Sequence, residues 1–517
     1  MMKLNFKASL AATISINRSV SKLQQVDMEV LPHHRDTSPS WVLLNSFGSR
    51  KDDATIVGDA RTVADSCTST GHPFRVSFGL APPPASSYLN YTWLGATGPP
   101  RADTSDRPRF VAAHNDVVLF ELRTLPTPQA RFYHSDYFLY QAAGPARPPS
   151  LSLLPACYIP MQYERHRCGG VTGRREDFPR IMEEKDTVVL RRRDGDLFVA
   201  QLEVSYGDEE SNEALINEMS EVSDDDDEVQ PEAVSDDEDE VPEAVSDDDD
   251  VPAASRRVRR MNFELCVFRP GVSNDGWELK QAVPIVYGDG ESASGGGIDA
   301  KHLPDWQWQT DAAIPVSDRF LCFVDFLRGI LVCDTVDLDR PLTLRYVPLP
   351  LETTVDRGWR GRPRMNERRN LSAAAGAAQL RLVSIDSRCC CGGPGRTSCA
   401  RGRFAFTVTT WTLSLMAGNG EASATGWVKD GVLDCEEVWG LPAYQGIPRV
   451  HLENPIASPD NANVVCFTVC NDSYASSREK KVWTVEVDMR SKEVLSAMPC
   501  TIDPWRADSR AAVKLNW

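Results

Sequence analysis

Four cysteines lying close together are the residues of this chain best suited to hold a metal ion. Cys389, Cys390 and Cys391 are adjacent, and Cys399 follows after a glycine-rich stretch. Thiolates are good ligands for a tetrahedral zinc ion. Three adjacent side chains do not easily converge on one ion, however, and no Cys-x-x-Cys pair accompanies them. The pattern therefore favours reduced thiols in a loop, and we expect neither a metal nor another cofactor.

Two carboxylates, Asp325 and Asp334, flank a strongly apolar stretch of the chain. Paired carboxylates can act in general acid–base catalysis when a pocket perturbs their pKa values. Aspartate at such positions also caps turns through side-chain to backbone hydrogen bonds, and we favour that interpretation. No phosphate-binding GxxxxGK[ST], zinc-binding HExxH or nucleophile GxSxG motif occurs. We therefore expect no catalytic residues.

Three serines carry the most regular candidate chemistry, since Ser223, Ser235 and Ser246 each precede an acidic run. They begin the imperfect repeats SDDDDEVQPEAV, SDDEDEVPEAV and SDDDDVP. Acidophilic kinases prefer such a context, and each phosphate would add a charge of about −1.5 to −2. We predict these serines as phosphorylation sites.

The acidic repeat dominates the charge of the protein. Residues 223–250 contain sixteen Asp or Glu and no Lys or Arg, so the net charge of −18 falls to −2 without them. Such a segment cannot bury a core and is expected to be disordered. It is either a solvated insertion in a surface loop or an arm that docks basic proteins such as histones or ribosomal proteins.

Basic clusters form a second group of candidates. Arg256, Arg257, Arg259 and Arg260 follow the acidic repeat and are typical either of a nuclear-import address or of a counter-charge for the repeat. Residues 191–193 and 357–369 are also basic, but Trp359 is the only aromatic residue in them. We interpret both as solvated loops and expect no nucleic acid partner.

The elements that position these residues are predicted to be short strands. The segment 320–350 indicates a β-hairpin with a four-residue loop, 326–329, and then a third strand. This loop would place Asp325 opposite Ile330 and Cys322 opposite Cys333. Gly329 would supply a positive φ at the turn.

Similar strand units recur along the chain, and several begin at a tryptophan. Trp277, Trp411 and Trp483 each begin an apolar–polar–apolar strand, and the units are spaced loosely by 40–50 residues once the acidic loop is excised. The pattern predicts a mostly-β protein, a β-propeller of about six or seven blades, with paired β-sandwiches as the alternative. Short helices are expected only at 209–219 and 365–378.

Several motifs in fixed order resemble a plant domain-of-unknown-function family, numbered 1618 and abundant in grasses. They are Trp308-Gln309-Thr310-Asp311, Cys322-Phe323-Val324-Asp325, Arg328-Gly329-Ile330-Leu331, Cys333-Asp334 and Val347-Pro348-Leu349-Pro350. The resemblance extends over roughly residues 40–490, with the family domain at about 308–455, and the organisation also resembles F-box-associated β-propellers. The family has no known catalytic residues, so the resemblance implies none here.

These observations predict four regions: a flexible start at 1–30, a first propeller half at 31–206, a disordered acidic and basic segment at 207–260, and a second half at 261–517. We expect a non-enzymatic scaffold that binds a protein partner through propeller loops, with the acidic arm modulating. The alternatives are a hydrolase or lyase with its site at the channel mouth, and an acidic chaperone for basic proteins.

The same reasoning bears on location. No stretch approaches the roughly 20 apolar residues of a membrane helix, so no membrane partner is expected. We predict a cytoplasmic or nuclear protein. Residues 1–23 are basic and contain no acid, which is also compatible with organelle targeting.

Overall fold

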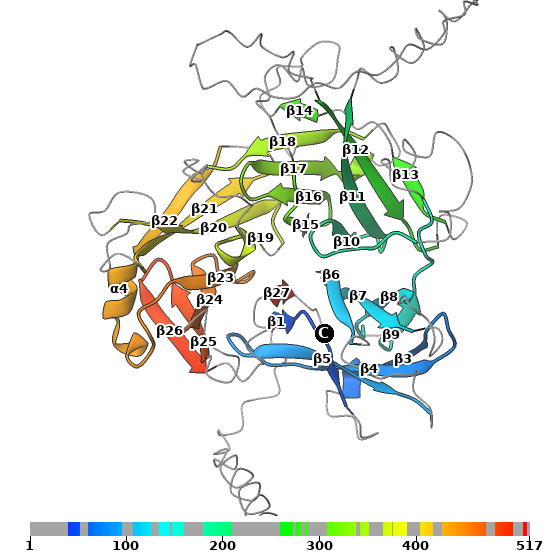
Figure 1. Cartoon of the computed structure of the whole chain (residues 1–517), viewed down its shortest axis with the longest axis horizontal. Helices are drawn as coiled ribbons and strands as arrows, with labels where there is room; N and C mark the ends of the chain where they lie inside the picture. The colour runs from blue at the N-terminus through cyan, green and yellow to red at the C-terminus, as the bar shows by residue number, and fades with distance from the viewer. Residues whose placement is uncertain are drawn as a thin grey trace, which may run out of the picture. The chain divides into compact units, whose positions relative to one another are not determined.

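The computed structural model describes residues 40–51, 60–95, 107–125, 134–144, 147–159, 179–208, 259–271, 276–280, 285–287, 308–337, 342–350, 365–374, 376–389, 404–416, 426–471, 481–499 and 510–513. All of them belong to one compact unit, Pro39–Trp517. Six sheets form the blades of a β-propeller (Figure 1). The predicted fold class is confirmed, with six blades. The predicted flexible start at 1–30 lies outside the described residues.

Blade 1 is built from both ends of the described chain. Its strand order is β27-β1-β5-β4-β3, and β2 pairs with β5 outside this path. β27 runs antiparallel to β1, with Val42 opposite Val513, and this pairing closes the ring. The strands of this blade are β1 (Val42–Asn45), β2 (Ser49–Arg50), β3 (Ala64–Cys67), β4 (Pro73–Gly79), β5 (Ser86–Trp93) and β27 (Arg510–Val513), and the 3-10 helix η1 is Ala60–Thr62.

Blades 2 and 3 are four-stranded meanders in chain order. Their strands are β6 (Arg109–His114), β7 (Val117–Thr124), β8 (His134–Gln141) and β9 (Ser150–Leu153) in blade 2, and β10 (Thr187–Arg191), β11 (Leu197–Asp208), β12 (Arg259–Phe268) and β13 (Glu278–Lys280) in blade 3. β11 and β12 pair from Val199 opposite Phe268 to Asp208 opposite Arg259. The acidic repeat therefore lies within the connection between two neighbouring strands of blade 3.

Blade 4 contains the predicted hairpin and third strand. Its order is β14-β18-β17-β16-β15, and its strands are β14 (Ile285–Tyr287), β15 (Ala312–Val316), β16 (Phe320–Asp325), β17 (Gly329–Asp334) and β18 (Leu344–Pro348), with the 3-10 helix η4 at Thr335–Asp337. The predicted register is wrong by one residue. Asp325 lies opposite Gly329, so the loop has three residues and Cys322 lies opposite Val332.

The corrected register separates two cysteines that we expected to be neighbours. Cys333 packs into the cluster shared with blade 3, whereas Cys322 packs into the cluster shared with blade 5. Successive residues of β16 and β17 alternate between these two clusters, because both faces of the blade are covered by neighbours. Continuous apolar sequence is the expected result of burial on both faces.

Gly329 is required for a reason other than the one predicted. It is not among the glycines with positive φ. A Cβ atom there would lie 2.5 Å from Tyr346 Cε2 and 2.5 Å from the Val347 carbonyl oxygen. The glycine therefore permits β18 to approach β17 closely, rather than shaping the turn.

Blades 5 and 6 complete the ring. Their strands are β19 (Arg369–Ala373), β20 (Gln379–Ser387), β21 (Phe406–Ser414) and β22 (Val428–Asp434) in blade 5, and β23 (Leu452–Ala457), β24 (Val464–Cys470), β25 (Val482–Asp488) and β26 (Glu493–Pro499) in blade 6. The short helices are η5 (Met365–Glu367), α4 (Cys435–Gly440) and η6 (Pro442–Tyr444). The predicted helix at 365–378 is wrong, since only one 3-10 turn precedes β19. The helix predicted at 209–219 lies outside the described residues.

Six apolar clusters join the blades in pairs. Five of them lie between blades 1 and 2, 2 and 3, 3 and 4, 4 and 5, and 5 and 6. The sixth packs Trp41 and Leu43 against Ile456 and Cys466, so it joins blade 6 to blade 1. The core therefore lies between neighbouring sheets around the whole ring. Fully burying each large apolar side chain there contributes about 1.5–3 kcal/mol to stability.

Two tryptophans connect consecutive blades by the same device. Trp277 precedes the fourth strand of blade 3, and its indole Nε1–H donates to the Pro155 carbonyl after the fourth strand of blade 2, at 2.8 Å. Trp427 precedes the fourth strand of blade 5 and donates to the Pro348 carbonyl of blade 4 at 2.8 Å. Each bond fastens the outer part of a blade to the blade before it.

The expected repeat length is wrong. The inner strands of successive blades begin at Arg109, Thr187, Ala312, Arg369 and Leu452, so every interval exceeds 50 residues. The tryptophan-led strands also differ in position, because Trp277 precedes a fourth strand whereas Trp411 and Trp483 lie in third strands. The blades share their architecture without sharing one sequence signature.

Candidate functional site

A cavity of about 780 Å³ lies within the ring of blades. Its wall comes from the inner strands β6, β15, β19 and β23 and from the residues at both ends of β10. These strands surround the centre in Figure 1. Since the wall includes both ends of β6, β10 and β15, the cavity follows the length of the inner strands. Pockets of this size are typical of small-ligand sites.

A buried carboxylate organises the blade 2 side of the wall. Glu121 on β7 is fully buried and accepts from Arg109 Nε at 2.6 Å, Arg123 Nε at 2.8 Å and Ser135 Oγ at 2.8 Å. Burial alone would raise the pKa of Glu121, but the two guanidinium groups and the hydroxyl hold it below its ordinary value. Arg109 is thereby fixed as part of the wall rather than left free to bind a ligand.

His114, at the end of β6, is the only histidine among the described residues of the cavity wall. Its Nδ1 accepts the Arg191 backbone N–H at 2.9 Å, and the ring also bonds the backbone of Ser317. Burial lowers the pKa of His114 to about 4, against the opposing charge of Asp116. A neutral imidazole with these partners connects blades 2, 3 and 4 and is poorly placed to shuttle protons.

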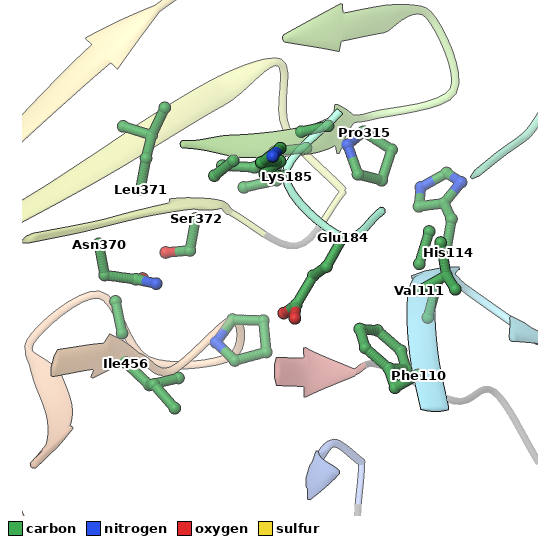
Figure 2. A pocket seen from close by; sticks show the side chains of 18 of the residues that line it. Phe110, Val111, His114, Glu184, Lys185, Pro315, Asn370, Leu371, Ser372 and Ile456 are labelled. Carbon is green, nitrogen blue, oxygen red and sulfur yellow. The ribbon is translucent and has the colours of Figure 1, made fainter. Parts of the chain in front are cut away.

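The segment before β10 contributes Glu183 and Glu184 to the wall of the cavity. Arg109 Nη2 donates to the Met182 carbonyl at 3.2 Å, and the Met182 N–H donates to the Tyr137 hydroxyl at 2.8 Å. Glu183 pairs with Lys185 at 2.5 Å. Glu184, between them, points into the space enclosed by the wall, as Figure 2 shows. The fixed backbone on either side therefore directs the Glu184 side chain into the cavity.

Glu184 differs from the other charged groups of the wall because its charge is unpaired among the described residues. Its side chain is exposed to the cavity, and no ion pair or hydrogen bond joins it to another described residue. The enclosing wall raises the pKa of Glu184 from 4.5 to about 7, while the charge of Arg109 acts in the opposite direction. Water in the cavity still reaches the side chain and moderates the cost of charging it.

The blade 5 side of the wall offers polar groups on β19. Arg369 is buried and donates from Nη1 to the Phe326 carbonyl of blade 4 at 2.5 Å, and burial lowers its pKa. Asn370 follows, and its Oδ1 is buried without a hydrogen-bond partner among the described residues. Ser372 lies two positions further along the strand, so it shares a face with Asn370. Figure 2 shows both side chains on one side of the cavity.

The predicted carboxylates Asp325 and Asp334 lie at opposite ends of the hairpin. Asp325 is fully buried and accepts the Leu327 N–H at 2.9 Å and Arg328 Nη1 at 2.8 Å. Asp334 accepts the Val336 N–H at 3.1 Å and pairs with Arg319 at 2.6 Å. The side-chain to backbone bonds expected for turn caps are therefore present at both positions.

The basic residues 191–193 lead into an exposed turn of blade 3, and their charges are paired. Arg191 pairs with Asp116 at 3.0 Å, and Arg193 pairs with Asp318 of blade 4 at 3.0 Å. Arg192 lies 3.7 Å from Asp194. Arg191 and Arg193 thereby connect blade 3 to blades 2 and 4 at the wall of the cavity, whereas Arg192 pairs within its own turn.

Most of the other predicted site residues lie outside the described ranges. This applies to Cys390, Cys391, Cys399, Ser223, Ser235, Ser246, Arg256 and Arg257. Cys389 is described and half-buried, and its carbonyl accepts Arg388 Nη1 at 3.2 Å. Arg259 and Arg260 are the first two residues of strand β12. Within the described ranges no group of three or more His, Cys, Asp or Glu side chains could hold a metal ion.

Sequence reasoning missed the residues of the cavity. Glu184, Asn370 and Ser372 belong to no motif, and only ring closure brings blades 3 and 5 around one space. Helix α4 was also missed, although its signal is present. Asp434 accepts the Glu436 N–H at 2.9 Å and donates its own N–H to Glu437 at 3.0 Å, a capping box readable as D-x-x-E.

Comparison with known proteins supports the predicted resemblance over part of the chain. Residues 323–466, from β16 to β24, match the family model described as protein of unknown function (DUF1618). No curated protein matches. Sixteen chains of solved structures match, among them the WD40 domain of SCAP from fission yeast, at 8% identity, 92% coverage of this chain, 96% of that chain and a TM-score of 0.26. Among the described residues no helix has the length and apolar character to span a bilayer.

Proposed function

We propose that this β-propeller is a non-enzymatic scaffold that binds a protein partner beside the opening of its central cavity. The observation that carries the proposal is a pair of exposed apolar side chains on a rigid frame. Tyr158 is 55% exposed and Ile181 is 51% exposed. Ile181 lies two residues before Glu183, which lines the cavity. Exposed apolar side chains on a fixed backbone are typical of binding hot spots.

Arg180 builds the frame beneath these two side chains. Its backbone N–H donates to the Cys157 carbonyl at 2.7 Å, and its Nε donates to the Ile159 carbonyl at 2.6 Å. Its Nη2 also lies 3.0 Å from the Glu203 carboxylate of β11. The arginine is nearly fully buried, so the segments that carry Tyr158 and Ile181 are held together and against blade 3. A partner would meet a preorganised surface and lose little conformational entropy in ordering it.

The chemistry of the cavity supports binding rather than catalysis. A hydrolase or lyase would need a nucleophile or base free to reach the substrate. His114, Glu183 and Asp318 are each engaged with a neighbouring residue of the wall. Among the described residues Glu184 is the one carboxylate of the wall left without such a partner, and one carboxylate does not make an acid–base pair.

The acidic repeat is proposed to act as an arm that modulates binding of basic segments. Its connection leaves blade 3 at Asp208 and returns at Arg259, which lie opposite each other on β11 and β12. Both ends are thereby anchored to the same blade. Deleting residues 223–250 should weaken capture of a basic partner at low salt and matter less at high salt, because the attraction is screened.

The proposal is tested by pairwise binding with a partner identified by affinity capture on the full chain. Tyr158→Ser and Ile181→Ser should each weaken binding of the purified partner by about tenfold or more, as expected for hot-spot residues. Leu495→Ser is the matched control, because Leu495 on β26 is also 51% exposed. Equal loss of binding in all three variants, or no loss in the first two, contradicts the proposal.

A further inference from the structure

We infer that the central cavity binds a guanidinium or primary ammonium group carried on a short aliphatic chain, with the Glu184 carboxylate as its acceptor. The inference extends the proposed function, because basic side chains of a partner and free amines both carry such groups. It rests on the unpaired carboxylate of Glu184, on the polar face of β19 and on the apolar remainder of the wall.

The charged side chains of the cavity wall have partners, with one exception. The cations of the wall have acidic partners: Arg109 pairs with Glu121, Lys185 with Glu183, Arg191 with Asp116, Arg192 with Asp194, Arg193 with Asp318 and Arg369 with Asp386. Asp311 accepts the Phe326 N–H at 2.8 Å. In the part of the chain that the structure describes, Glu184 alone among the wall's charged groups lacks a partner. A cationic ligand would give the Glu184 carboxylate a partner.

The unpaired carboxylate also favours a donor-rich ligand. The Glu184 carboxylate only accepts hydrogen bonds when it is ionised, and it is exposed to the cavity. The Ser372 hydroxyl lies on the same face of β19 as Asn370 and can accept a further N–H. A ligand with several N–H donors and no acceptor meets this arrangement best.

The apolar part of the wall suits an aliphatic stem. Phe110 on β6, Pro315 on β15 and Ile456 on β23 line the same cavity (Figure 2). They come from three different blades, so a chain of a few methylene groups would be surrounded by carbon while its charged end meets Glu184. An anion would instead face an ionised carboxylate and cations that are already paired.

Three probes of similar length distinguish charge from shape: butylguanidinium, the neutral butylurea and the anionic butyrate. With the full chain at pH 8 we expect butylguanidinium to bind with a dissociation constant on the order of 1 mM or tighter, measured by calorimetry. Butylurea should bind at least about tenfold more weakly, because it lacks the charge-assisted hydrogen bonds. Butyrate should not bind measurably. Equal binding of the cationic and neutral probes overturns the inference.

One variant locates the site. Glu184→Gln should weaken butylguanidinium binding by about tenfold or more, since it removes the negative charge and keeps the size of the side chain. Glu183→Gln is the matched control, because this neighbouring carboxylate is already paired with Lys185. Circular dichroism and urea unfolding would verify that each variant is folded. Unchanged binding in the folded Glu184→Gln protein overturns the inference.

A final comparison separates free amines from basic side chains of a partner. Agmatine and a tetrapeptide with a central arginine present the same guanidinium group. Competition of the purified partner by either compound, lost with Glu184→Gln, supports the cavity as its binding point. If the partner binds wild type and Glu184→Gln equally and neither compound competes, the partner does not bind in the cavity. The cavity then plays no part in the proposed function, which itself stands. If butylguanidinium binds but no protein partner does, the proposed function fails and the cavity site stands.

Discussion

Replacing Glu121 with glutamine should destabilise the propeller by about 2–4 kcal/mol. The carboxylate is fully buried and accepts from Arg109, Arg123 and Ser135 at 2.6–2.8 Å. Glutamine keeps one accepting oxygen but turns an amide N–H₂ toward one guanidinium group. At least one charge-assisted hydrogen bond is lost, worth about 1.5–3 kcal/mol, and a cation is left unpaired. The loss stays below the upper range of about 5 kcal/mol for a broken buried pair, because the Arg123 side chain is 42% exposed and can turn to water.

Urea unfolding followed by tryptophan fluorescence measures the difference in free energy of unfolding. The matched control is Glu183→Gln, which breaks an ion pair with Lys185 whose side chains are 41% and 51% exposed. Such a pair contributes only about 0–1 kcal/mol. A loss below about 0.5 kcal/mol in Glu121→Gln, or a loss equal to that of the control, would refute the structural reasoning.

The pH dependence of the same variant provides a second check. The pKa of Glu121 is lowered in the folded protein, so its contribution is present above the ordinary carboxyl pKa near 4.5 and declines as the pH falls through the lower folded value. The difference between wild type and Glu121→Gln should therefore be constant from pH 6 to 8 and shrink below about pH 4.5. A difference that persists unchanged into that acidic range would mean that the carboxylate charge is not what stabilises blade 2.

Three further predictions follow from other contacts. Gly329→Ala should cost at least about 2 kcal/mol, because the new Cβ would lie 2.5 Å from Tyr346, whereas Gly144→Ala, with open space around it, should stay within about 0.5 kcal/mol in the same urea assay. Trp277→Phe should lower the free energy of unfolding by at least about 0.5–1.5 kcal/mol, because the indole hydrogen bond to Pro155 is lost, and it should raise amide hydrogen exchange in blades 2 and 3. Unchanged exchange in these blades would contradict the role of this bond in holding them together. Glu184 has a raised pKa in the folded state, so the free energy of unfolding of wild type should fall as the pH rises from about 4.5 to 7. The loss should be no more than about 1 kcal/mol because the side chain is exposed, and Glu184→Gln should abolish this pH dependence.

The sequence contained enough information for the strands of blade 4 but not for their register. Burial on both faces makes β16 and β17 almost wholly apolar, which identifies the strands and erases the alternation that would fix the register. One residue of loop length then decided which side of the blade each cysteine faces. The role of Gly329 was equally hidden, because it depends on how closely β18 approaches.

Elements whose signal depends on distant contacts were harder to predict. The segment 365–378, which we expected to be helical, contains β19 and the alanines that follow it. β19 forms the inner strand of blade 5 because tertiary packing overrides propensity. Glu184 and Asn370 come from separate blades and have no local signature. The cavity is a property of the closed ring, and no single segment of sequence encodes it.

Ring closure through β1 and β27 carries a risk for the molecule. β1 is a wholly buried strand with three apolar residues, and the backbone of Arg510–Val513 occupies one of its two hydrogen-bonding edges. Proteolytic loss of those four residues would uncover unpaired amide and carbonyl groups next to Val42, Leu43 and Leu44. Such an edge is a template for intermolecular pairing and aggregation. A chain clipped after residue 509 would therefore be expected to self-associate, which light scattering would detect.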